Sequence, residues 1–230
     1  MKAETAYHGE LGEQFATLST DNAYNAYTDR PAMLELAGDV SGLQVLDLGC
    51  GAGHFAAELL GVGAAKVVGV DGSESLLNAA RQRLGDGGNL HHHDLEERLA
   101  FLDDKSFDLV VMALVYHHID AREQLLAEIR RVLRSGGRLL VSTTHPTADW
   151  VYFGGSYFAD DPVQLPLGDG FIRFRRMPLQ TFLGELLSAG FVLEELVEPR
   201  ATEQARVVDP RRYDKTHQIP TFLTVKLRCP

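Results

Sequence analysis

The sequence predicts an α/β fold in which a parallel sheet is covered by helices on both faces. Between residues 44 and 142, short apolar runs alternate with stretches that have helical periodicity. The apolar runs are nearly continuous, which is typical of parallel strands that are buried on both sides. Crossover connections between such strands are right-handed, so the sheet is expected to be doubly wound.

Turn and cap residues separate the elements of this region. Ser73 is placed to cap a helix, and Gly136 begins the turn that leads into the fifth strand. The expected strands are 44–48, 66–70, 89–92, 107–112 and 138–142. The expected helices between them are 54–60, a helix that begins after Ser73, and 120–133.

The two ends of the chain are expected to add helices, a strand pair and two irregular segments. Residues 1–40 form an N-terminal helical cap with helices over 4–15 and 22–38, and residues 41–230 form the main domain. Residues 144–177 are interpreted as a lid insertion, because long loops in a compact domain are more often functional than idle. The remaining elements are an irregular stretch over 145–177, a helix over 178–189, a strand over 191–197, a second irregular stretch over 199–220 and a strand over 221–228.

The composition excludes several classes of protein. Of the 230 residues, 45% are hydrophobic and 23% are charged, which is the balance of a soluble globular chain. A formal net charge of −10 argues against a nucleic-acid or anionic-membrane binder, since such proteins need a basic face. Cys50 and Cys229 do not make a disulfide framework, and no apolar run is long enough to span a bilayer, so a cytoplasmic location is expected.

A glycine-rich loop follows the first strand, and an acid ends the second. Gly49, Gly51 and Gly53 form the loop, and Asp71 follows Gly49 by 22 residues. Glycines let the backbone approach a ligand closely, and the next helix presents free N–H groups. Ligands of doubly wound sheets bind at the carboxyl ends of the strands. Asp71 can therefore accept hydrogen bonds from both ribose hydroxyls of an adenosine. The alternative interpretation is that the loop is only a tight structural turn and that Asp71 only caps a helix.

The details of the loop favour a cationic cofactor over a dinucleotide. His54 stands where a dinucleotide fingerprint has its third glycine, which allows close packing of helix and strand. Asp47, two residues before the loop, would repel a pyrophosphate. S-adenosylmethionine carries a sulfonium and an ammonium and therefore suits this acidic neighbourhood. A nicotinamide-dependent oxidoreductase is the less favoured alternative.

Four segments resemble motifs of the class I S-adenosylmethionine-dependent methyltransferases, in particular those that act on small molecules. Residues 45–53 (VLDLGCGAG) resemble motif I, and residues 70–73 (VDGS) resemble the second motif. Residues 93–95 and 133–139 are similar to the adenine segment and to the turn before the fifth strand. The resemblance implies a seven-stranded Rossmann-like sheet of order 3-2-1-4-5-7-6 with the last strand antiparallel. It also implies that S-adenosylmethionine is the cofactor and S-adenosylhomocysteine the product.

The resemblance assigns residues around the second and third strands to the adenosine half of the cofactor. Asp71 would bind the ribose, and Ser73 or the backbone of Gly72 would touch the adenosine. Asp94 would accept a hydrogen bond from the adenine amino group. The other two contacts are the backbone of Leu95 and the side chain of Leu76, which would pack on the adenine ring.

Other residues are assigned to the methionine half. The glycine loop would line it, and Asp47 would hold its ammonium directly or through the loop. The backbone at Ala113 and Leu114 would face the amino-acid end. Arg30 is similar to an arginine that pairs with the cofactor carboxylate in related methyltransferases, although a surface arginine at a helix start is the alternative. Tyr24, from the same N-terminal segment, is also expected to contact the cofactor.

The lid insertion and the N-terminal cap are rich in aromatic residues. Such rings either hold a flat or apolar acceptor or form a satellite core beneath the insertion. The rings are Tyr7, Tyr24, Tyr27, Trp150, Tyr152, Phe153, Tyr157, Phe158, Phe171 and Phe174. Three arginines of the lid either bind an anionic acceptor or, as favoured here, pair with nearby acids. These arginines are Arg173, Arg175 and Arg176, and the acids are Asp160, Asp161 and Asp169.

Three histidines follow strands at the edge where the cofactor is expected. A hydroxyl or ammonium acceptor must lose a proton, and histidine is the natural base near neutral pH. His117 and His118 follow the fourth strand and His145 follows the fifth, so each is a candidate base with a structural role as its alternative. The histidines of 91–93 are expected to end a strand, because adjacent side chains point to opposite faces, and no metal is expected.

These features predict methyl transfer from S-adenosylmethionine to an O, N or C atom of a small organic acceptor, with a secondary metabolite as one candidate. Residues 112–117 lack the Asn/Asp-Pro-Pro-aromatic motif of nucleic-acid base methyltransferases. A cyclase-like or regulatory protein that binds S-adenosylmethionine without methylating is the main alternative. A monomer or homodimer is expected, without nucleic-acid or membrane partners.

Overall fold

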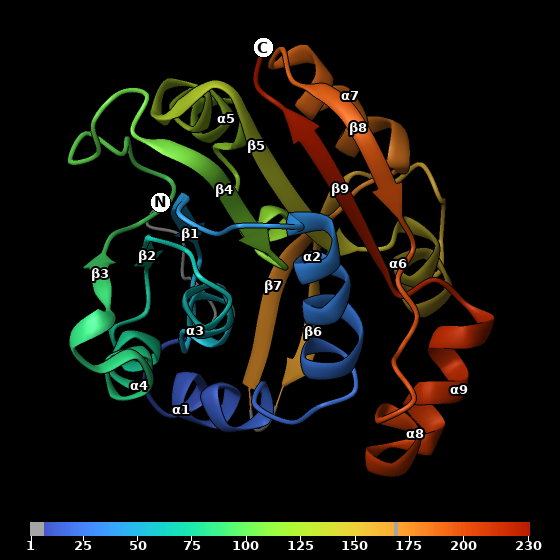
Figure 1. Ribbon diagram of the computed structural model, residues 1–230. Coiled ribbons are helices and arrows are strands. Elements are labelled where there is room, and N and C mark those ends of the chain that lie inside the picture. The colour runs from blue at the N-terminus through green and yellow to red at the C-terminus, as the bar shows by residue number, and fades with distance from the viewer. Residues whose placement is uncertain (1–6, 168–169) are drawn as a thin grey trace.

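The central sheet has the predicted order and strand directions. A computed structural model describes residues 7–167 and 170–230, and its seven-stranded sheet has the order β3-β2-β1-β4-β5-β9-β8 (Figure 1). β9 runs antiparallel to β5 and β8, while the pairs from β3 to β5 are parallel. The strands are β1 (Gln44–Leu48), β2 (Lys66–Asp71), β3 (Asn89–His92), β4 (Phe107–Ala113), β5 (Leu133–Thr144), β8 (Val192–Val197) and β9 (Phe222–Arg228).

Helices cover both faces of this sheet, as the apolar strands require. One core packs α2 and α3 against the sheet through side chains such as Met33 and Phe55. The other packs α5 and α7 through side chains such as Leu126 and Phe182. Burial of each such side chain contributes about 1.5–3 kcal/mol, so the two cores hold the strand ends in fixed positions. The helices are α2 (Arg30–Ala37), α3 (His54–Gly61), α4 (Glu74–Leu84), α5 (Arg122–Val132) and α7 (Leu179–Ser188), with 3-10 turns at η2 (Gly85–Gly87) and η3 (Tyr116–His118).

The N-terminal cap differs in one respect from the expected pair of helices. α1 (Gly9–Leu18) is present, and the start expected for it at Glu4 lies outside the described residues. The helix expected over 22–38 begins instead with a π-helical turn, η1 (Asn25–Asp29), in which the Asp29 N–H donates to the Tyr24 carbonyl. α2 follows directly, with Pro31 in its first turn and Gly38 at its end, as predicted.

The lid contains regular structure where the sequence predicted an irregular stretch. α6 (Pro146–Phe153) is followed by a two-stranded antiparallel sheet of β6 (Asp161–Leu167) and β7 (Gly170–Arg176). In β7 exposed Phe171 and Arg173 alternate with buried Ile172 and Phe174. This alternation spans only four residues, so it is too short to stand out among the surrounding glycines and prolines.

The segment 199–220 was also predicted to be irregular, and this prediction was wrong. It forms α8 (Ala205–Val208) and α9 (Pro210–Gln218), and the Asp209 side chain caps α9 by accepting from the Arg212 N–H at 3.0 Å. Only Thr216 of α9 is buried, so this helix lacks the apolar stripe that would have revealed it. Within residues 7–167 and 170–230, none of the helices combines the length and apolar character needed to cross a membrane.

Candidate active site

Asp71 links the glycine loop to the start of α4. It ends β2 with only 9% of its surface exposed. Its Oδ2 accepts from the Gly51 N–H and its Oδ1 from the Ser73 N–H, both at 2.8 Å. Burial raises the pKa of this carboxyl, while the two N–H donors act in the opposite direction. The carboxylate is therefore oriented before any ligand arrives, and each oxygen keeps a lone pair for a further donor.

The glycines of the loop are required by its geometry. Gly49 has φ +71°, and a Cβ built on it would lie 2.3 Å from a methyl carbon of Val115. Gly53, with φ +75°, directly precedes α3 and has the left-handed conformation that glycine adopts without strain. The loop can therefore pack against the segment that follows β4.

Asp47 carries a buried oxygen that has no partner. The residue is 1% exposed, and its Oδ2 has no hydrogen-bond partner among the described residues. Burial, and then the charge of Asp71, raise the pKa of Asp47 to about 7. A buried carboxylate is costly unless it is paired, so this group fits a cationic ligand. The ammonium of S-adenosylmethionine satisfies that requirement, whereas a pyrophosphate would add repulsion.

The chain is strained immediately after β4. Leu114 has φ +58°, and its N–H donates to the carbonyl and to the hydroxyl of Ser142 at 3.2 and 3.0 Å. For a residue with a Cβ the left-handed conformation costs about 1–2 kcal/mol. Strain of this kind gathers at ligand-binding sites, and here it lies where the amino-acid end of the cofactor is expected.

The residues assigned to adenosine lie together at the ends of β2 and β3. The His93 N–H donates to the Asp71 carbonyl at 3.0 Å, which holds the two strand ends side by side. Asp94 accepts from the Glu96 N–H at 3.0 Å through Oδ1. Ser73 caps α4 as predicted, and the Gly72 carbonyl accepts from His92 Nε2 at 3.0 Å. The side chains of Leu76 and Leu95 are both buried.

Arg30 and Tyr24, the residues of the N-terminal cap that were assigned to the cofactor, contact different parts of the structure. The Arg30 guanidinium donates to the Ser19 carbonyl at 3.0 Å and pairs with Glu58 of α3 at 3.6 Å. The Tyr24 ring meets Phe222 edge-on at 5.8 Å, and Arg212 of α9 lies over it at 5.0 Å. Arg30 is thus close to the helix that follows the glycine loop, while the described ring contacts of Tyr24 are with the C-terminal part of the chain.

The two described residues before α1, Tyr7 and His8, form a segment that we call the N-terminal strap, and Tyr7 of this strap docks on the site. The Tyr7 carbonyl accepts from the hydroxyls of Ser73 and Ser75. The Tyr7 ring meets His118 edge-on at 5.8 Å, and burial and the charge of Asp71 raise the pKa of its phenol. The strap thus lies between the ends of β2 and β4. Its docking joins residues that are far apart in the chain, so no local pattern could indicate it.

The three candidate bases have different surroundings. His118 Nδ1 lies 3.1 Å from the Arg173 carbonyl, which can only accept, so Nδ1 carries the proton and neutral His118 keeps a lone pair on Nε2. Burial lowers its pKa to about 4. His117 is buried beside the Thr143 hydroxyl at 3.0 Å, and burial holds its pKa well below the usual value. His145 Nδ1 caps α6 by accepting from the Thr147 N–H at 3.1 Å, and its Nε2 pairs with Glu198 at 3.0 Å, so both of its nitrogens are engaged.

A row of rings connects the strap to the lid. Neighbouring centroids are 4.7 to 6.2 Å apart, and the rings come from the strap, η3, β7 and α6. This aromatic row consists of Tyr7, His118, Phe174, Phe153 and Tyr152. Leu11 of α1 also lies close to Gly170 of the hairpin formed by β6 and β7, called here the lid hairpin. Figure 1 shows α1 and β6–β7 next to the same edge of the sheet. The strap and the lid therefore close over the strand ends together.

The aromatic residues of the lid differ in burial, and its arginines pair with acids. Phe174 is buried, whereas Phe158 and Phe171 are 77% and 63% exposed, so only part of the lid forms a satellite core. The favoured pairing of the lid arginines is confirmed for Arg175 with Asp160 at 2.5 Å and Arg176 with Asp161 at 2.6 Å. The third arginine, Arg173, pairs instead with Asp120 at 3.3 Å, and Asp169 lies outside the described residues.

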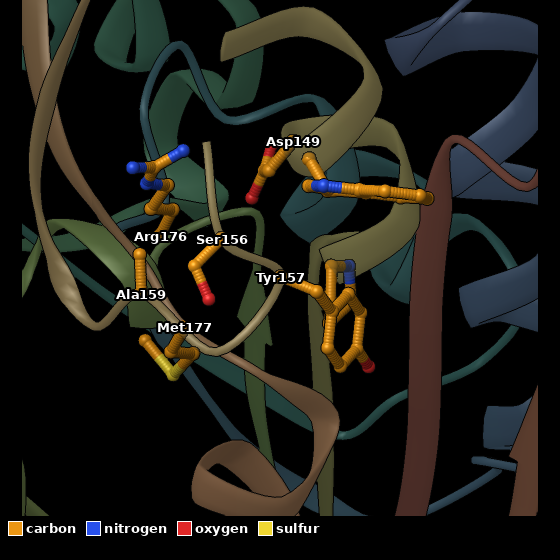
Figure 2. Close-up of a pocket in the computed structure, with 8 residues that line it drawn as sticks. Asp149, Ser156, Tyr157, Ala159, Arg176 and Met177 are labelled. Carbon is orange, nitrogen blue, oxygen red and sulfur yellow. The ribbon is translucent and has the colours of Figure 1, made fainter. Parts of the chain in front are cut away.

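A small cavity lies within the lid. Figure 2 shows Asp149, Ser156 and Arg176 around it. Asp149 accepts from the Thr144 hydroxyl at 2.8 Å, and burial raises its pKa to about 6. Among the described residues, no group of three or more His, Cys, Asp or Glu side chains has the arrangement of a metal site.

Comparison with known proteins identifies the family. Residues 46–141 match the protein-family profile described as a methyltransferase domain. The chain is 30% identical over 226 residues to an uncharacterised protein of Haemophilus influenzae, covering 89% of this chain and 88% of that protein. It also resembles the solved S-adenosylmethionine-dependent methyltransferase of Mesorhizobium loti, with 27% identity, a TM-score of 0.70 and coverage of 86% and 96%.

Two relatives in sequence that are named as methyltransferases of particular compounds match over a shorter region. The chain is 34% identical over 123 residues to a demethylmenaquinone methyltransferase of Lactococcus lactis and 33% identical over 147 residues to 27-O-demethylrifamycin SV methyltransferase of Amycolatopsis mediterranei. These matches cover 51% and 59% of this chain, and the chain spans about half of each enzyme, 49% and 50%. The chain belongs to the class I S-adenosylmethionine-dependent methyltransferases.

Proposed function

We propose that the protein transfers a methyl group from S-adenosylmethionine to an O, N or C atom of a small organic acceptor. The observation that carries this proposal is the buried, unpartnered carboxylate of Asp47 beside the pre-oriented Asp71 at one edge of the sheet. Two acids there suit a cofactor that is cationic and free of phosphate. The relatives named above, which are methyltransferases of a quinone precursor and of a rifamycin, support a small acceptor.

The chain would hold the two halves of the cofactor separately. Asp71 would accept from the ribose hydroxyls while the backbone of Ser73 keeps it in place. Asp94, at the end of β3, would accept from the adenine amino group. The glycine loop and Asp47 would surround the methionine half. When bound, S-adenosylmethionine supplies a methyl group activated by its sulfonium.

The residues of the aromatic row would orient the acceptor and exclude water. In-line displacement needs donor and acceptor aligned, and a closed site provides that alignment. His118 is the base that the geometry favours, because the Arg173 carbonyl leaves its Nε2 free to take a proton. This arrangement suits an acceptor hydroxyl or ammonium, since both must lose a proton during transfer.

Calorimetric titration tests the cofactor assignment. S-adenosylhomocysteine should bind the full-length protein, and NAD⁺ should not. Formation of S-adenosylhomocysteine from S-adenosylmethionine is then measured against a panel of small phenols, hydroxylated macrolides and amines. Binding of NAD⁺ but not of S-adenosylhomocysteine would overturn the proposal. Binding of S-adenosylhomocysteine, followed by conversion of an acceptor without methyl transfer, would favour the cyclase-like alternative.

A further inference from the structure

The lid hairpin contacts the turn that carries His118 through two successive residues of β7. The Arg173 carbonyl lies 3.1 Å from His118 Nδ1, and the Arg173 guanidinium donates to Oδ2 of Asp120 at 3.3 Å. Asp120 follows His118 by two residues, so Arg173 holds both ends of one short segment. The buried Phe174 ring meets the His117 and His118 rings edge-on at 5.2 and 6.2 Å. One strand of the lid therefore fixes the position of the candidate base.

β7 has backbone groups available for contacts outside the hairpin. It pairs with β6 along one edge, where Gln164 lies opposite Arg173. Among the described strands, none pairs with its other edge, and such an edge presents backbone donors and acceptors. A carbonyl only accepts, so a neutral ring that faces it must carry its proton on the facing nitrogen. The tautomer of His118 is thus set by a backbone group that belongs to the lid.

The ion pair of Arg173 connects the lid to the central domain. The next two arginines of β7 pair with acids of the lid itself. Asp120, in contrast, lies between η3 and α5, where its N–H donates to Glu96 at 2.7 Å. The side chains of Arg173 and Asp120 are 47% and 52% exposed, so their pair contributes little to overall stability. Its effect is local, because it favours the position in which β7 lies against η3.

We propose that Arg173 is a positioning residue that makes His118 an effective base only while the lid hairpin lies on η3. This inference rests on the proposed function and adds a condition to it. With the carbonyl in place, Nδ1 carries the proton, and the proton of an acceptor hydroxyl or ammonium passes to Nε2, which leaves His118 as the imidazolium. With the hairpin displaced, either nitrogen can carry the proton, and a ring protonated on Nε2 has no lone pair there. Closure of the lid and activation of the base are then one event.

Nitrogen-15 NMR of the histidine rings distinguishes the two neutral tautomers directly. Full-length protein labelled at histidine is recorded at pH 7.5 with saturating S-adenosylhomocysteine, and the spectrum of His118→Gln assigns the His118 signals. The variants are Arg173→Ala, Arg173→Asp, Asp120→Arg and the double charge exchange. Arg175→Ala is the matched control, because Arg175 lies in the same strand and pairs with Asp160 of the lid. Both exchanged residues are exposed, so the variants should fold, and thermal unfolding of each is recorded.

The wild type and Arg175→Ala should carry the proton on Nδ1 of His118. Arg173→Ala should raise the ratio of the Nε2-protonated to the Nδ1-protonated form roughly twofold to fivefold, the range that loss of an exposed ion pair gives. Each single charge reversal should raise this ratio further, and the double exchange should restore it. A wild type protonated on Nε2 would overturn the inference. So would Arg173 variants with the wild-type ratio, or a double exchange that restores nothing.

Affinity for S-adenosylhomocysteine separates this inference from the proposed function. Calorimetry on the same samples should give values within twofold of the wild type, because the substitutions lie outside the residues assigned to the cofactor. A wild type that does not bind S-adenosylhomocysteine would refute the proposed function itself. Normal binding with a tautomer that does not respond to the Arg173 variants would refute only the role of Arg173.

Discussion

The hydroxyl of Ser73 donates a hydrogen bond to the carbonyl of Tyr7, a residue 66 positions earlier in the chain. Ser73 also caps α4 and donates its N–H to Asp71. One residue therefore connects the N-terminal strap, the helix that follows β2 and the acid that is expected to bind ribose. We expect cofactor exchange to require the strap to leave this position.

Removal of the Tyr7 ring should speed cofactor exchange. Tyr7→Ala loses the contacts with His118 and with Phe15, whose ring centroid is 4.2 Å away, and should raise the dissociation rate of S-adenosylhomocysteine several-fold. Stopped-flow displacement measures this rate. Tyr7→Phe keeps the ring and should behave like the wild type. Equal rates for Tyr7→Ala and the wild type would show that the strap does not control exchange.

Loss of the Asp71 carboxylate should weaken cofactor binding by about 1–3 kcal/mol, because charged hydrogen bonds to the ribose are lost. Calorimetry with S-adenosylhomocysteine on Asp71→Ala measures the effect. Asp71→Asn, which can keep one of the two backbone contacts, separates this loss from distortion of the loop. Exposed Glu97 gives the matched control, and Glu97→Ala should be unaffected. Wild-type affinity in both Asp71 variants would contradict the ribose assignment.

His118 and His145 should respond oppositely to substitution. His118→Ala should lower turnover about 10²- to 10⁴-fold, the usual contribution of a general base. His145→Ala should keep turnover near the wild-type value and lower stability by about 0.5–2 kcal/mol, because a helix cap is lost. His117→Ala tests the third candidate. Turnover and thermal unfolding are measured on all three, and full turnover in every variant would mean that transfer needs no histidine base.

Cofactor affinity should increase with pH between about 5.5 and 7.5. The pKa of Asp47 in the protein without ligand is raised to about 7, so below that pH a proton must leave before the carboxylate can hold a cation. Proton release therefore opposes binding at low pH and ceases to do so above about 7. Affinity for S-adenosylhomocysteine should rise roughly tenfold across this range, as measured by calorimetry, and Asp47→Asn should flatten the profile. A profile that falls with pH would contradict the role of Asp47.

The buried carboxyl of Asp29 should make the folded protein less stable at neutral pH than at pH 4. Burial raises the pKa of Asp29 to about 7 from an ordinary value of 3.8, so the folded state binds more protons than the unfolded state between these values. Stability is therefore lost as pH rises from about 4 to 7. Asp29→Asn should raise the melting temperature at pH 8 more than at pH 4.5, and calorimetric scans at both values test this. The same gain at both values would mean that Asp29 is not destabilised by burial.

The local sequence pattern was sufficient to predict the sheet and the positions of the glycine loop and Asp71 at the ends of its strands. The apolar runs before Gly49 and Asp71 identify strands that are buried on both faces, and β1 ends directly before Gly49 and β2 ends at Asp71, as predicted. The lid hairpin and α9 were not predicted, because one has a very short alternation and the other has almost no apolar face. The contacts of Tyr7 with Ser73 and of Tyr27 with Thr202 join distant parts of the chain. Such contacts follow from the packing of the whole fold and leave no mark in any local stretch of sequence.

The wide turn at η1 begins the helix that continues as α2, so it sets the orientation of α2 relative to the residues before it. An α-helix advances by 100° per residue, so one additional residue in the turn rotates everything before it relative to everything after it. After the turn, Met33 and Leu36 face the sheet. Tyr24, just before the turn, meets Phe222, and Tyr27, within the turn, accepts from the Thr202 N–H through its carbonyl at 2.8 Å, so both contact the C-terminal part of the chain. Deleting a single residue there would rotate the two halves out of phase, so the spacing of this turn couples the two ends of the chain.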